Sequence, residues 1–571
     1  MTSFRIERLP FDQRNVDTWR QVEPRFSNWP VVYVLADGQR VYVGETRNAA
    51  ARMKQHLESQ ERRTLESVRV VLDDTFNKSA CLDLESLLIR LFAGDGKYEV
   101  LNRNEGIVNA DYYDRTTYQE RFDAIFEALR EQRLFTRDIL AIENTELFKL
   151  SPFKALNQDQ AIAMEGILDV LFEDLAKSDG STIVVEGEPG TGKTVIAVYL
   201  MKLLGDIERS VDTEDLDGDS LFSDYFLEGY AQLLEGFRMG IVVPQQALRA
   251  SLQKVFRRTP GLDAAMVLTP FDVGLSDEPW DLLIVDETHR LNQRANQASA
   301  MQNRRFGAIN EKLFGADGDE HTQADWIVAQ SRHRIFLLDA AQSVRPADLP
   351  ARVVSELTAS ASEQGRLHRL ASQMRVRAGS DYIGFVRVLL RGDQPAPRDF
   401  GDYEFRLFDD LGQMHGAIRA RDEEYGLSRL VAGYAWPWRS RKDSSALDID
   451  VDGYQLRWNQ TQKDWINSVG AIDEVGSIHT VQGYDLNYAG VIIGPDLRLD
   501  PDTGRIVFDR SNYFDKKGME NNPRLGIEYS DEDLLDYVRN IYAVLLTRAV
   551  RGTYVFVTDD PLRAHLAHAF T

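Results

Sequence analysis

Hydrophobic residues near the start of the chain form short strand-like runs, and these are followed by helical spacing. Residues 31–44 (VVYVLADGQRVYVG) hold two β-branched and aromatic runs on either side of an Asp-Gly pair, which is typical of a β-hairpin. The next segment, NAAARMKQHLES, is rich in residues of high helix propensity, and Asn48 is a suitable N-cap. The pattern predicts two strands followed by a helix.

A further strand is predicted at SVRVVL and an apolar helix at CLDLESLLIRLF, before the segment closes at LNRNEG. These elements predict a compact first domain over residues 1–110. Over residues 111–150 we expect a helical connector that packs between the two halves of the chain, because large apolar side chains recur there at helical spacing. These side chains are Phe122, Ile125, Phe126 and Leu129.

From Ser151 onward, apolar strand-like runs alternate with helical segments. The runs are STIVVE, IVVPQ, LLIVDE, IFLLDA, LVAGYAW, AGVIIG and TYVFVT. Short buried runs separated by helices are typical of parallel α/β sheets. We therefore predict an α/β fold with one parallel-sheet domain over residues 151–350 and a second over residues 351–571. The acidic run at 206–220 predicts a solvated insertion in the first of them.

Length and composition agree with a multidomain protein. A chain of 571 residues is too long for one hydrophobic core and suggests roughly three to four compact units. No apolar stretch has the length of a membrane span, and the charged N-terminus lacks the apolar core of a secretory signal. We expect a cytoplasmic protein with no membrane partner. The single cysteine, Cys81, lies in an apolar helical run and is expected to be buried.

The net charge of −23 argues against a protein that simply coats nucleic acid, since phosphate binding depends on Lys and Arg. The acidic excess is uneven, because residues 1–110 carry equal numbers of basic and acidic side chains. A channel lined locally with arginine can still bind a strand within an acidic protein. Net charge therefore leaves a nucleic-acid partner open.

The loop after STIVVE satisfies the phosphate-loop pattern and opens a helix. Its backbone N–H groups and the helix N-terminus would surround phosphates, Lys193 would reach the β and γ phosphates, and Thr194 would hold Mg²⁺. The nucleotide-binding residues predicted here are Gly187, Gly190, Thr191, Gly192, Lys193 and Thr194. Further on, Asp286 would bind the magnesium shell and Glu287 would polarise the attacking water. Together the two motifs predict hydrolysis of ATP with Mg²⁺.

The segments around these motifs resemble those of superfamily 1 helicases, in that family's order along the chain. LNQDQ resembles the adenine-recognising segment, and IFLLDAAQSVRP the motif that senses the γ-phosphate. LASQMRVRAG and NIYAVLLTRAVRG resemble the segments that carry two arginine fingers, and SIHTVQGYDL resembles a further motif in which Asp485 stands where Glu is common. The resemblance implies two RecA-like domains, with site residues Gln160, Gln342, Arg375, Gln482 and Arg548.

A narrower resemblance concerns AGYAWPW at 432–438 and the Gly-Pro-Asp after the VIIG run. Both resemble the helicase-like domain of Schlafen-related proteins, and the likeness spans residues 151–571. The tryptophans of this half are either base-stacking residues or core residues, and the sequence assigns them no role. They are Trp436, Trp438, Trp458 and Trp465.

Residues 28–110 resemble the GIY-YIG nuclease family. VVY stands where Gly-Ile-Tyr is usual and YVG stands for Tyr-Ile-Gly, and the residues at the family's spacing are Tyr33, Tyr42, Arg52, His56, Glu85 and Asn102. The resemblance implies that Tyr33 is the base or its relay and that Tyr42 orients water or phosphate. It also implies that Arg52 stabilises the transition state and that Glu85 binds one Mg²⁺. Arg52 and His56 are four residues apart on a predicted helix, so a joint phosphate contact is expected.

Three classes of function remain open: a nuclease-translocase on DNA or RNA, an ATPase switch that gates a nuclease without translocation, and a binding protein whose two centres have decayed. The third is disfavoured because the expected catalytic residues are present. We expect ATP and Mg²⁺ as cofactors and a nucleic-acid partner, with DNA favoured over RNA. A homo-oligomer or a defence-system partner protein is a further expectation, and defence against invading DNA is the favoured role.

Overall fold

The computed structural model describes residues 4–103, 112–177, 180–209, 221–226, 228–294, 297, 299–339, 344–378, 380–461, 464–481 and 484–570. Gln342, Gln482 and residues 210–220 of the acidic run lie outside the described residues. The chain forms two compact units. Unit 1 comprises Met1–Glu165, Val195–Gly236 and Ser251–Ala265, and unit 2 comprises Gly166–Thr194, Phe237–Ala250 and Met266–Thr571.

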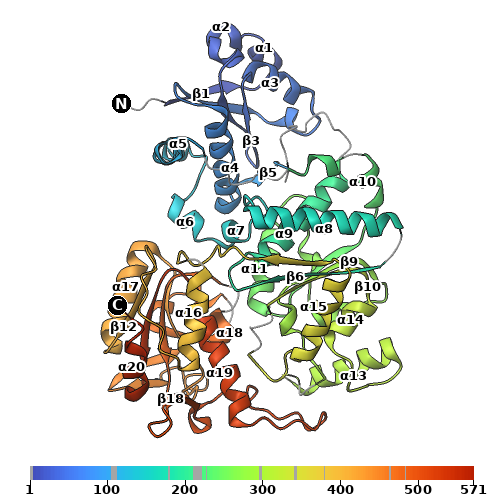
Figure 1. The fold of residues 1–571 in the computed structure, drawn as a ribbon. Coiled ribbons are helices and arrows are strands. Elements are labelled where there is room, and N and C mark those ends of the chain that lie inside the picture. Colours follow the sequence, from blue (N-terminus) through green and yellow to red (C-terminus); the bar gives the residue numbers. More distant parts are fainter. Residues whose placement is uncertain are drawn as a thin grey trace. The chain divides into compact units, whose positions relative to one another are not determined.

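Unit 1 contains a five-stranded sheet of order β1-β4-β2-β3-β5 (Figure 1). Its strands are β1 (Phe4–Pro10), β2 (Val31–Ala36), β3 (Arg40–Thr46), β4 (Ser67–Asp73) and β5 (Glu99–Val100). The predicted hairpin is β2 and β3, which pair antiparallel. β1 was not predicted from the sequence. It pairs antiparallel with β4 along its whole length, and its charged side chains remain accessible because it lies at the edge of the sheet.

The helices of the first 165 residues include the two that the sequence predicts next to this sheet. Asn48 caps α3 (Ala49–Glu58), since its side chain accepts a hydrogen bond from the backbone N–H of Ala51 at 3.0 Å. Cys81 is buried within α4 (Lys78–Asp95), as expected. The other helices here are α1 (Gln13–Val16), α2 (Trp19–Val22), α5 (Arg115–Glu131), α6 (Ile139–Glu143) and α7 (Glu146–Lys149).

Two hydrophobic clusters cover the two faces of this sheet. One contains Tyr33 and Tyr42 with residues of α3, and the other contains residues of β2, β3, α4 and α5. The predicted helical spacing is confirmed in α5, whose apolar side chains are buried in the second cluster together with those of α4. That cluster reaches as far as Phe153, so the core of the first sheet extends well past residue 110.

Unit 2 contains a six-stranded parallel sheet of order β11-β6-β10-β9-β7-β8. Its strands are β6 (Ser181–Gly187), β7 (Met239–Val242), β8 (Val267–Leu268), β9 (Trp280–Val285), β10 (Ser331–Leu338) and β11 (Leu367–Leu370). The helices that precede or separate these strands along the chain, some of which belong to unit 1, are α8 (Gln158–Lys177), α9 (Lys193–Glu208), α10 (Glu228–Leu233), α11 (Gln246–Phe256), α12 (Pro270–Leu275), α13 (Ala300–Phe314), α14 (Gln323–Ala329) and α15 (Ala351–Glu363).

A seven-stranded sheet of order β12-β20-β17-β13-β16-β15-β14 follows in the same unit, parallel except for β14. Its strands are β12 (Glu404–Phe408), β13 (Ser428–Ala432), β14 (Ile449–Val451), β15 (Tyr454–Trp458), β16 (Glu474–Ser477), β17 (Leu486–Ile493) and β20 (Ala549–Val557). A separate hairpin pairs β18 (Leu497–Leu499) with β19 (Ile506–Phe508). The prediction of two parallel sheets is therefore confirmed.

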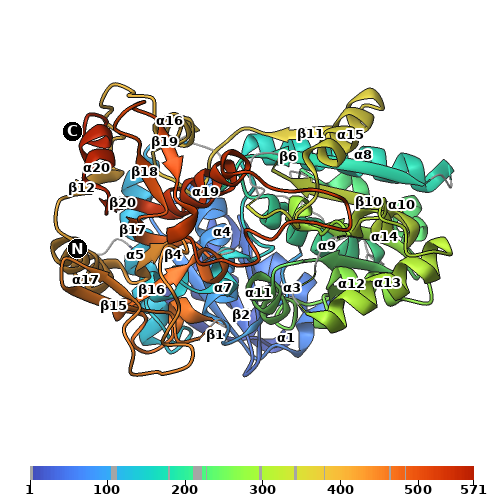
Figure 2. The same ribbon diagram turned by 90° about the horizontal axis from the view of Figure 1, so that it is seen from below.

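Helices lie on both faces of the seven-stranded sheet (Figure 2). Residues of α16 (Ser380–Arg391), α19 (Asp531–Leu546) and α20 (Asp560–Ala567) share one large cluster with the sheet, whereas α17 (Leu411–Tyr425) packs in a second cluster. The short helix α18 (Ile478–Val481) follows β16. The loops that follow β6 and β9 lie at the carboxyl ends of parallel strands, where ligands of such folds bind.

Candidate functional site: the phosphate loop, the arginines of unit 2 and a tyrosine-histidine cluster

The loop between β6 and α9 has the backbone that a phosphate cradle requires. Gly190 and Gly192 have φ of 85° and 86°, which side-chain-bearing residues rarely adopt. A Cβ atom at Gly187 would lie 2.5 Å from Thr191 Oγ1, and one at Gly190 would collide with the Gln373 side chain. The three glycines are thus required by conformation or by space.

Lys193 and Thr194 begin α9 and point to different partners. Lys193 Nζ donates to the carbonyl oxygens of Gly187 at 2.6 Å and Glu188 at 3.0 Å, so the ammonium lies within the curl of the loop. Thr194 Oγ1 donates to Asp286 Oδ2 at 2.6 Å. A hydroxyl and a carboxylate in contact beside a phosphate loop form the oxygen-rich pair that Mg²⁺ prefers.

Asp286 and Glu287 follow the carboxyl end of β9 and differ in their acidity. Burial, with Glu287 adjacent, raises the pKa of Asp286 to about 6. Burial also opposes ionisation of Glu287, but contacts with His289 and the charges of Arg290 and Lys193 outweigh it and lower the pKa of Glu287 below its usual range. His289 Nε2 lies 3.0 Å from Glu287 Oε2. Glu287 also has φ of 52°, a strained backbone of the kind found at active sites.

Two arginines of unit 2, one from each sheet region, interact electrostatically with each other and with Glu287 or Asp485. Arg375, after β11, forms an ion pair with Asp485 through its Nε. Arg548, after α19, is 4% exposed, and its Nη1 donates to the carbonyl oxygen of Tyr484 at 3.4 Å. Burial and the charge of Arg375 lower the pKa of Arg548 to about 9, against the opposing pull of Asp485 and Glu287. An anion bound next to Arg548 would stabilise its positive charge and raise its pKa again.

The segment between β11 and α16 also contacts the phosphate loop directly. Gln373 Nε2 donates to the carbonyl oxygen of Pro189 at 2.6 Å, and the backbone N–H of Met374 donates to the carbonyl oxygen of Gly190 at 2.9 Å. Arg387 on α16 bonds Glu188 at 2.7 Å. Sequence reasoning missed Gln373 and Arg387. Gln373 lies in the same motif as Arg375, so the motif pointed to its neighbourhood, whereas nothing in the sequence pointed to Arg387.

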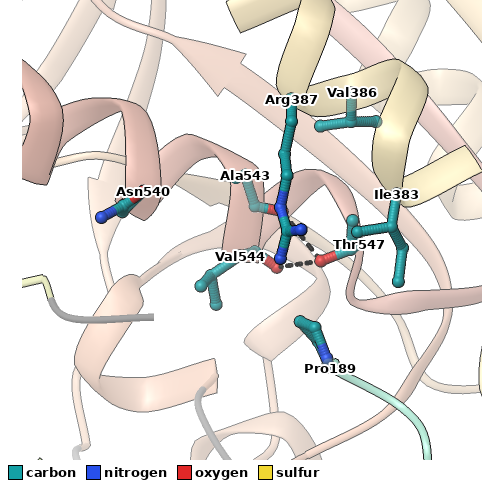
Figure 3. A pocket seen from close by; sticks show the side chains of 8 residues that line it. All are labelled: Pro189, Ile383, Val386, Arg387, Asn540, Ala543, Val544 and Thr547. Carbon is teal, nitrogen blue, oxygen red and sulfur yellow. Dashed lines mark hydrogen bonds between the residues drawn. The ribbon is translucent and has the colours of Figure 1, made fainter. Parts of the chain in front are cut away.

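A small pocket opens beside the phosphate loop between α16 and α19. Figure 3 shows Pro189 facing side chains from both helices, with the Thr547 hydroxyl bonded to the carbonyl oxygens of Ala543 and Val544. The residues lining the pocket are Pro189, Ile383, Val386, Arg387, Asn540, Ala543, Val544 and Thr547. Its walls are mostly apolar, and Arg387 supplies the charge.

The tertiary structure brings Tyr33, Tyr42 and His56 together in unit 1. Tyr33 Oη and His56 Nε2 are 2.8 Å apart, and the His56 ring meets the Tyr42 ring edge-on with centroids at 5.1 Å. Gly44 has no side chain to obstruct Tyr33, whose hydroxyl occupies the place of a Cβ. His56 and Tyr33 both have no exposed surface, and the joint phosphate contact of His56 with Arg52 stays a prediction. Burial, helped by Tyr42, raises the pKa of Tyr33 well above its usual value.

Arg52, Glu85 and Asn102 surround this cluster differently. Arg52 is half-buried, donates to Gln55 Oε1 at 3.0 Å and acts electrostatically on Tyr33. Glu85 is half-buried on α4, and its charge raises the pKa of Tyr33. Asn102 pairs its side-chain amide with both backbone groups of Val43, at 2.8 and 3.1 Å, and so continues the β3–β5 ladder. Asn102 is therefore a structural residue here.

Gln160 lies in unit 1 at the start of α8. Its Oε1 accepts from the backbone N–H of Asn157 at 3.2 Å, while Asn157 Oδ1 accepts from the N–H of Gln160 at 2.8 Å. This reciprocal pair is a capping arrangement and explains the two amide residues at this spacing. Recognition of a base by Gln160 stays a prediction.

The tryptophans of the second sheet are part of its core. Trp458 and Trp465 have no exposed surface, Trp436 is 9% exposed, and Trp465 Nε1 donates to Glu474 Oε2 at 2.7 Å. Base stacking by the two fully buried rings is ruled out by their burial.

Within the described residues, no helix combines the length and apolar character needed to cross a bilayer. The same residues contain no group of three or more His, Cys, Asp or Glu side chains placed to hold a metal ion.

Comparison with known proteins supports a helicase-type domain. The model of the family described as "Schlafen group 3, DNA/RNA helicase domain" matches residues 180–559. The uncharacterized protein YPL245W of Saccharomyces cerevisiae is 25% identical over 443 residues, which cover 72% of this chain and 90% of that protein.

Solved structures of helicases show weaker similarity. The helicase nonstructural protein 10 of an arterivirus is 12% identical, with 70% of this chain and 65% of that chain covered and a TM-score of 0.28. A Pif1 helicase from Bacteroides, in complex with ADP-AlF3 and ssDNA, is 11% identical, with 70% and 93% covered and a TM-score of 0.24. The chain thus spans just under two thirds of the arterivirus helicase.

Proposed function

Because this chain belongs to the Schlafen group 3 DNA/RNA helicase domain family, we propose that it is an ATP-driven, nucleic-acid-processing enzyme with a superfamily 1-type motor and a metal-dependent endonuclease domain. The observation that carries the motor half is the convergence of Lys193, the Thr194–Asp286 pair and the two arginines in unit 2. The domains we propose are a nuclease domain at 1–110, a connector at 111–150 and RecA-like domains at 151–350 and 351–571. Two of these bounds need correction: β11 pairs with β6 and so extends the first parallel-sheet domain to residue 370, and the connector shares the core of the first sheet as far as Phe153.

The residues of unit 2 fit a bound magnesium nucleotide. Lys193 would exchange its two carbonyl partners for phosphate oxygens, and Thr194 and Asp286 would hold the metal. Bound MgATP supplies a phosphoanhydride whose hydrolysis releases the free energy that drives motion. Glu287, held ionised at neutral pH, accepts a proton from an attacking water.

The arginines supply the remaining charge. Arg548 follows α19, which packs on the seven-stranded sheet, so its movement toward the γ-phosphate would link hydrolysis to displacement of that half of unit 2. Arg375 follows β11, an edge strand of the six-stranded sheet, and would add charge from the phosphate-loop side. Arg548 gains most from an added anion, because it is buried beside a second arginine.

The nuclease half is proposed from the cluster around Tyr33. Phosphodiester hydrolysis needs a proton acceptor, a cation for the developing charge and a metal at the leaving oxygen. Tyr33 would be the base or its relay, and Tyr42 would orient water or phosphate. Arg52 would supply the cation and Glu85 would bind Mg²⁺. The electrostatic action of Arg52 and Glu85 on Tyr33 supports a shared site. A motor joined to such a domain suits degradation of invading DNA.

Two assays on the full chain test this proposal. ATP hydrolysis is measured alone and with single-stranded DNA, duplex DNA and RNA, and stimulation by one of them is expected. Strand cleavage with Mg²⁺ is measured for wild type, Glu85→Ala and Glu58→Ala, a control that removes an exposed carboxylate of α3. Undiminished cleavage by Glu85→Ala would remove the nuclease assignment. If none of the three nucleic acids stimulates ATP hydrolysis, the ATPase switch is favoured over the translocase.

A further inference from the structure

A chain of three buried polar side chains links Arg62, His56 and Tyr33 inside unit 1. Arg62 begins the short 3₁₀ turn Arg62–Thr64 after α3 and is 5% exposed, and the other two residues have no exposed surface. Arg62 Nη1 lies 3.2 Å from His56 Nδ1, and His56 Nε2 lies 2.8 Å from Tyr33 Oη. Both ring nitrogens of His56 therefore have a partner within hydrogen-bond distance.

The chemistry of the guanidinium decides the direction of both bonds. An arginine side chain carries only N–H donors, so His56 Nδ1 must accept and cannot carry a proton. Burial, and then the charges of Arg62 and Arg52, lower the pKa of His56 to about 2, so the ring is neutral and holds its one proton on Nε2. His56 Nε2–H consequently donates to Tyr33 Oη, and the hydroxyl hydrogen of Tyr33 must be directed elsewhere.

The position of Arg62 is itself fixed by packing. Its guanidinium carbon lies 4.3 Å from the centroid of the Tyr42 ring, a cation–π distance, and the same ring meets His56 edge-on. Tyr42, Arg62 and His56 thus contact one another pairwise, and His56 in turn bonds the Tyr33 hydroxyl. Sequence resemblance had selected the two tyrosines and His56 but not Arg62.

We propose that Arg62 is a positioning residue that locks His56 in the Nε2–H tautomer, so that Tyr33 Oη is held as a hydrogen-bond acceptor. The functional meaning rests on the proposed nuclease: His56 can donate to Tyr33 but cannot remove its proton. Tyr33 must then pass its proton to a group on the side away from His56, where water or substrate would bind.

The tautomer is measured directly, without any cleavage assay, by ¹⁵N NMR of the full chain labelled at its 9 histidines. His56→Gln identifies the signals of His56. In wild type, Nδ1 is expected at the downfield position of an unprotonated nitrogen and Nε2 at the upfield position of an N–H. A protonated Nδ1 in wild type would overturn the proposal.

Two variants separate the influence of Arg62 from that of Tyr33. Arg62→Met should convert the single tautomer into a mixture, whereas Arg62→Lys, which keeps a donor, should preserve it. Tyr33→Phe removes the partner of Nε2 and should leave the proton there, since Arg62 still occupies Nδ1. If Tyr33→Phe moves the proton to Nδ1, Tyr33 rather than Arg62 sets the tautomer and the proposal is wrong. The Tyr33→Phe measurement tests the proposal even if Arg62→Met fails to fold.

Cleavage is then a separate readout. If the nuclease proposal holds, Arg62→Lys should retain more turnover than Arg62→Met, in parallel with the tautomer. If wild type shows the Nε2–H tautomer but cleaves no nucleic acid, the nuclease proposal is wrong, whereas the proposed effect of Arg62 on the His56 tautomer is still supported.

Discussion

At the scale of single residues, Lys193 is held by the loop that surrounds it. Its ammonium donates to two carbonyl oxygens of the loop. We expect Lys193→Ala to lower ATP hydrolysis by at least about 10²-fold while the protein stays folded, because a fixed charge on the phosphates is lost. Turnover and the circular dichroism spectrum are measured beside Lys177→Ala, which removes an exposed lysine of α8. Near-normal turnover in Lys193→Ala would contradict the motor assignment.

Arg548 is the residue for which binding and hydrolysis should separate. A guanidinium that acts on transition-state charge contributes little to ground-state binding, so Arg548→Ala should keep nucleotide affinity and lose hydrolysis, by about 10²-fold or more. Binding of a fluorescent ATP analogue and turnover are measured in parallel. Arg352→Ala, at an exposed position of α15, is the control. An equal loss of affinity and turnover would mark Arg548 as a structural arginine.

Asp496, in the Gly-Pro-Asp segment after β17, predicts a pH dependence of stability. It is fully buried, accepts from Tyr542 Oη at 2.6 Å, and burial raises its pKa to about 7. The folded state therefore binds the proton more tightly than the unfolded state does. Relative to Asp496→Asn, which has no charge to bury, wild type should lose stability as pH rises from about 4 to about 7. The full effect is on the order of 4 kcal/mol.

Thermal unfolding of the two proteins between pH 5 and pH 8 checks this prediction. The melting temperature of Asp496→Asn should rise relative to wild type across that range. A difference that is independent of pH would show that Asp496 titrates outside this window.

At the scale of elements, a segment between β19 and α19 crosses from the seven-stranded half of unit 2 to the loop after α13. Arg524 donates to Asp317 Oδ2 at 3.0 Å and also bonds Asp319, while Asn522 Nδ2 donates to the carbonyl oxygen of Arg294 at 3.4 Å. Arg294 and then Arg524 lower the pKa of Asp317 to about 2. These bonds tie together two halves that must move if hydrolysis is to drive displacement.

We expect Arg524→Ala to have a small effect on global stability, about 1 kcal/mol or less, because the pairs are partly exposed. Its larger effect should be faster proteolysis of residues 513–530, where the released segment opens locally. Limited proteolysis and melting temperature are compared with Arg510→Ala, which removes another arginine of the same segment that pairs with Asp531. If the protease cuts both variants at the same rate, Arg524 does not hold this segment in place more than Arg510 does.

At the scale of the whole molecule, the chain joins a proposed nuclease to a proposed motor. If the motor delivers the strand, cleavage should respond to ATP even though the cutting reaction does not consume it. Cleavage with Mg²⁺ is therefore measured with and without ATP for wild type, Lys193→Ala and Glu85→Ala. We expect ATP to change cleavage in wild type alone. If wild type and Lys193→Ala cut identically under all conditions, the two activities only share a chain.

Patterns within a few residues were sufficient for much of the fold. The β2–β3 hairpin and the Asn48 cap of α3 follow from local propensity, periodicity and turn chemistry, which act over one element at a time. The same signals predicted only part of the two parallel sheets, namely strands β6, β7, β9, β10, β13, β17 and β20. The phosphate loop is equally local, because its glycines, Lys193 and Thr194 are consecutive. The sequence by itself therefore determined the α/β fold class and the consecutive residues of the candidate phosphate loop.

Only the tertiary structure decided which distant residues meet. β1 became a strand by pairing with β4, Trp465 became a core residue by bonding Glu474, and Gln373 came to bond Pro189 of the phosphate loop. Arg62 lies close to His56 in sequence, yet its role depends on the direction in which a buried guanidinium points. Such contacts form when side chains from separate elements are buried against each other and exchange water for protein partners. The periodicity of residues along the chain carries no information about which distant elements meet.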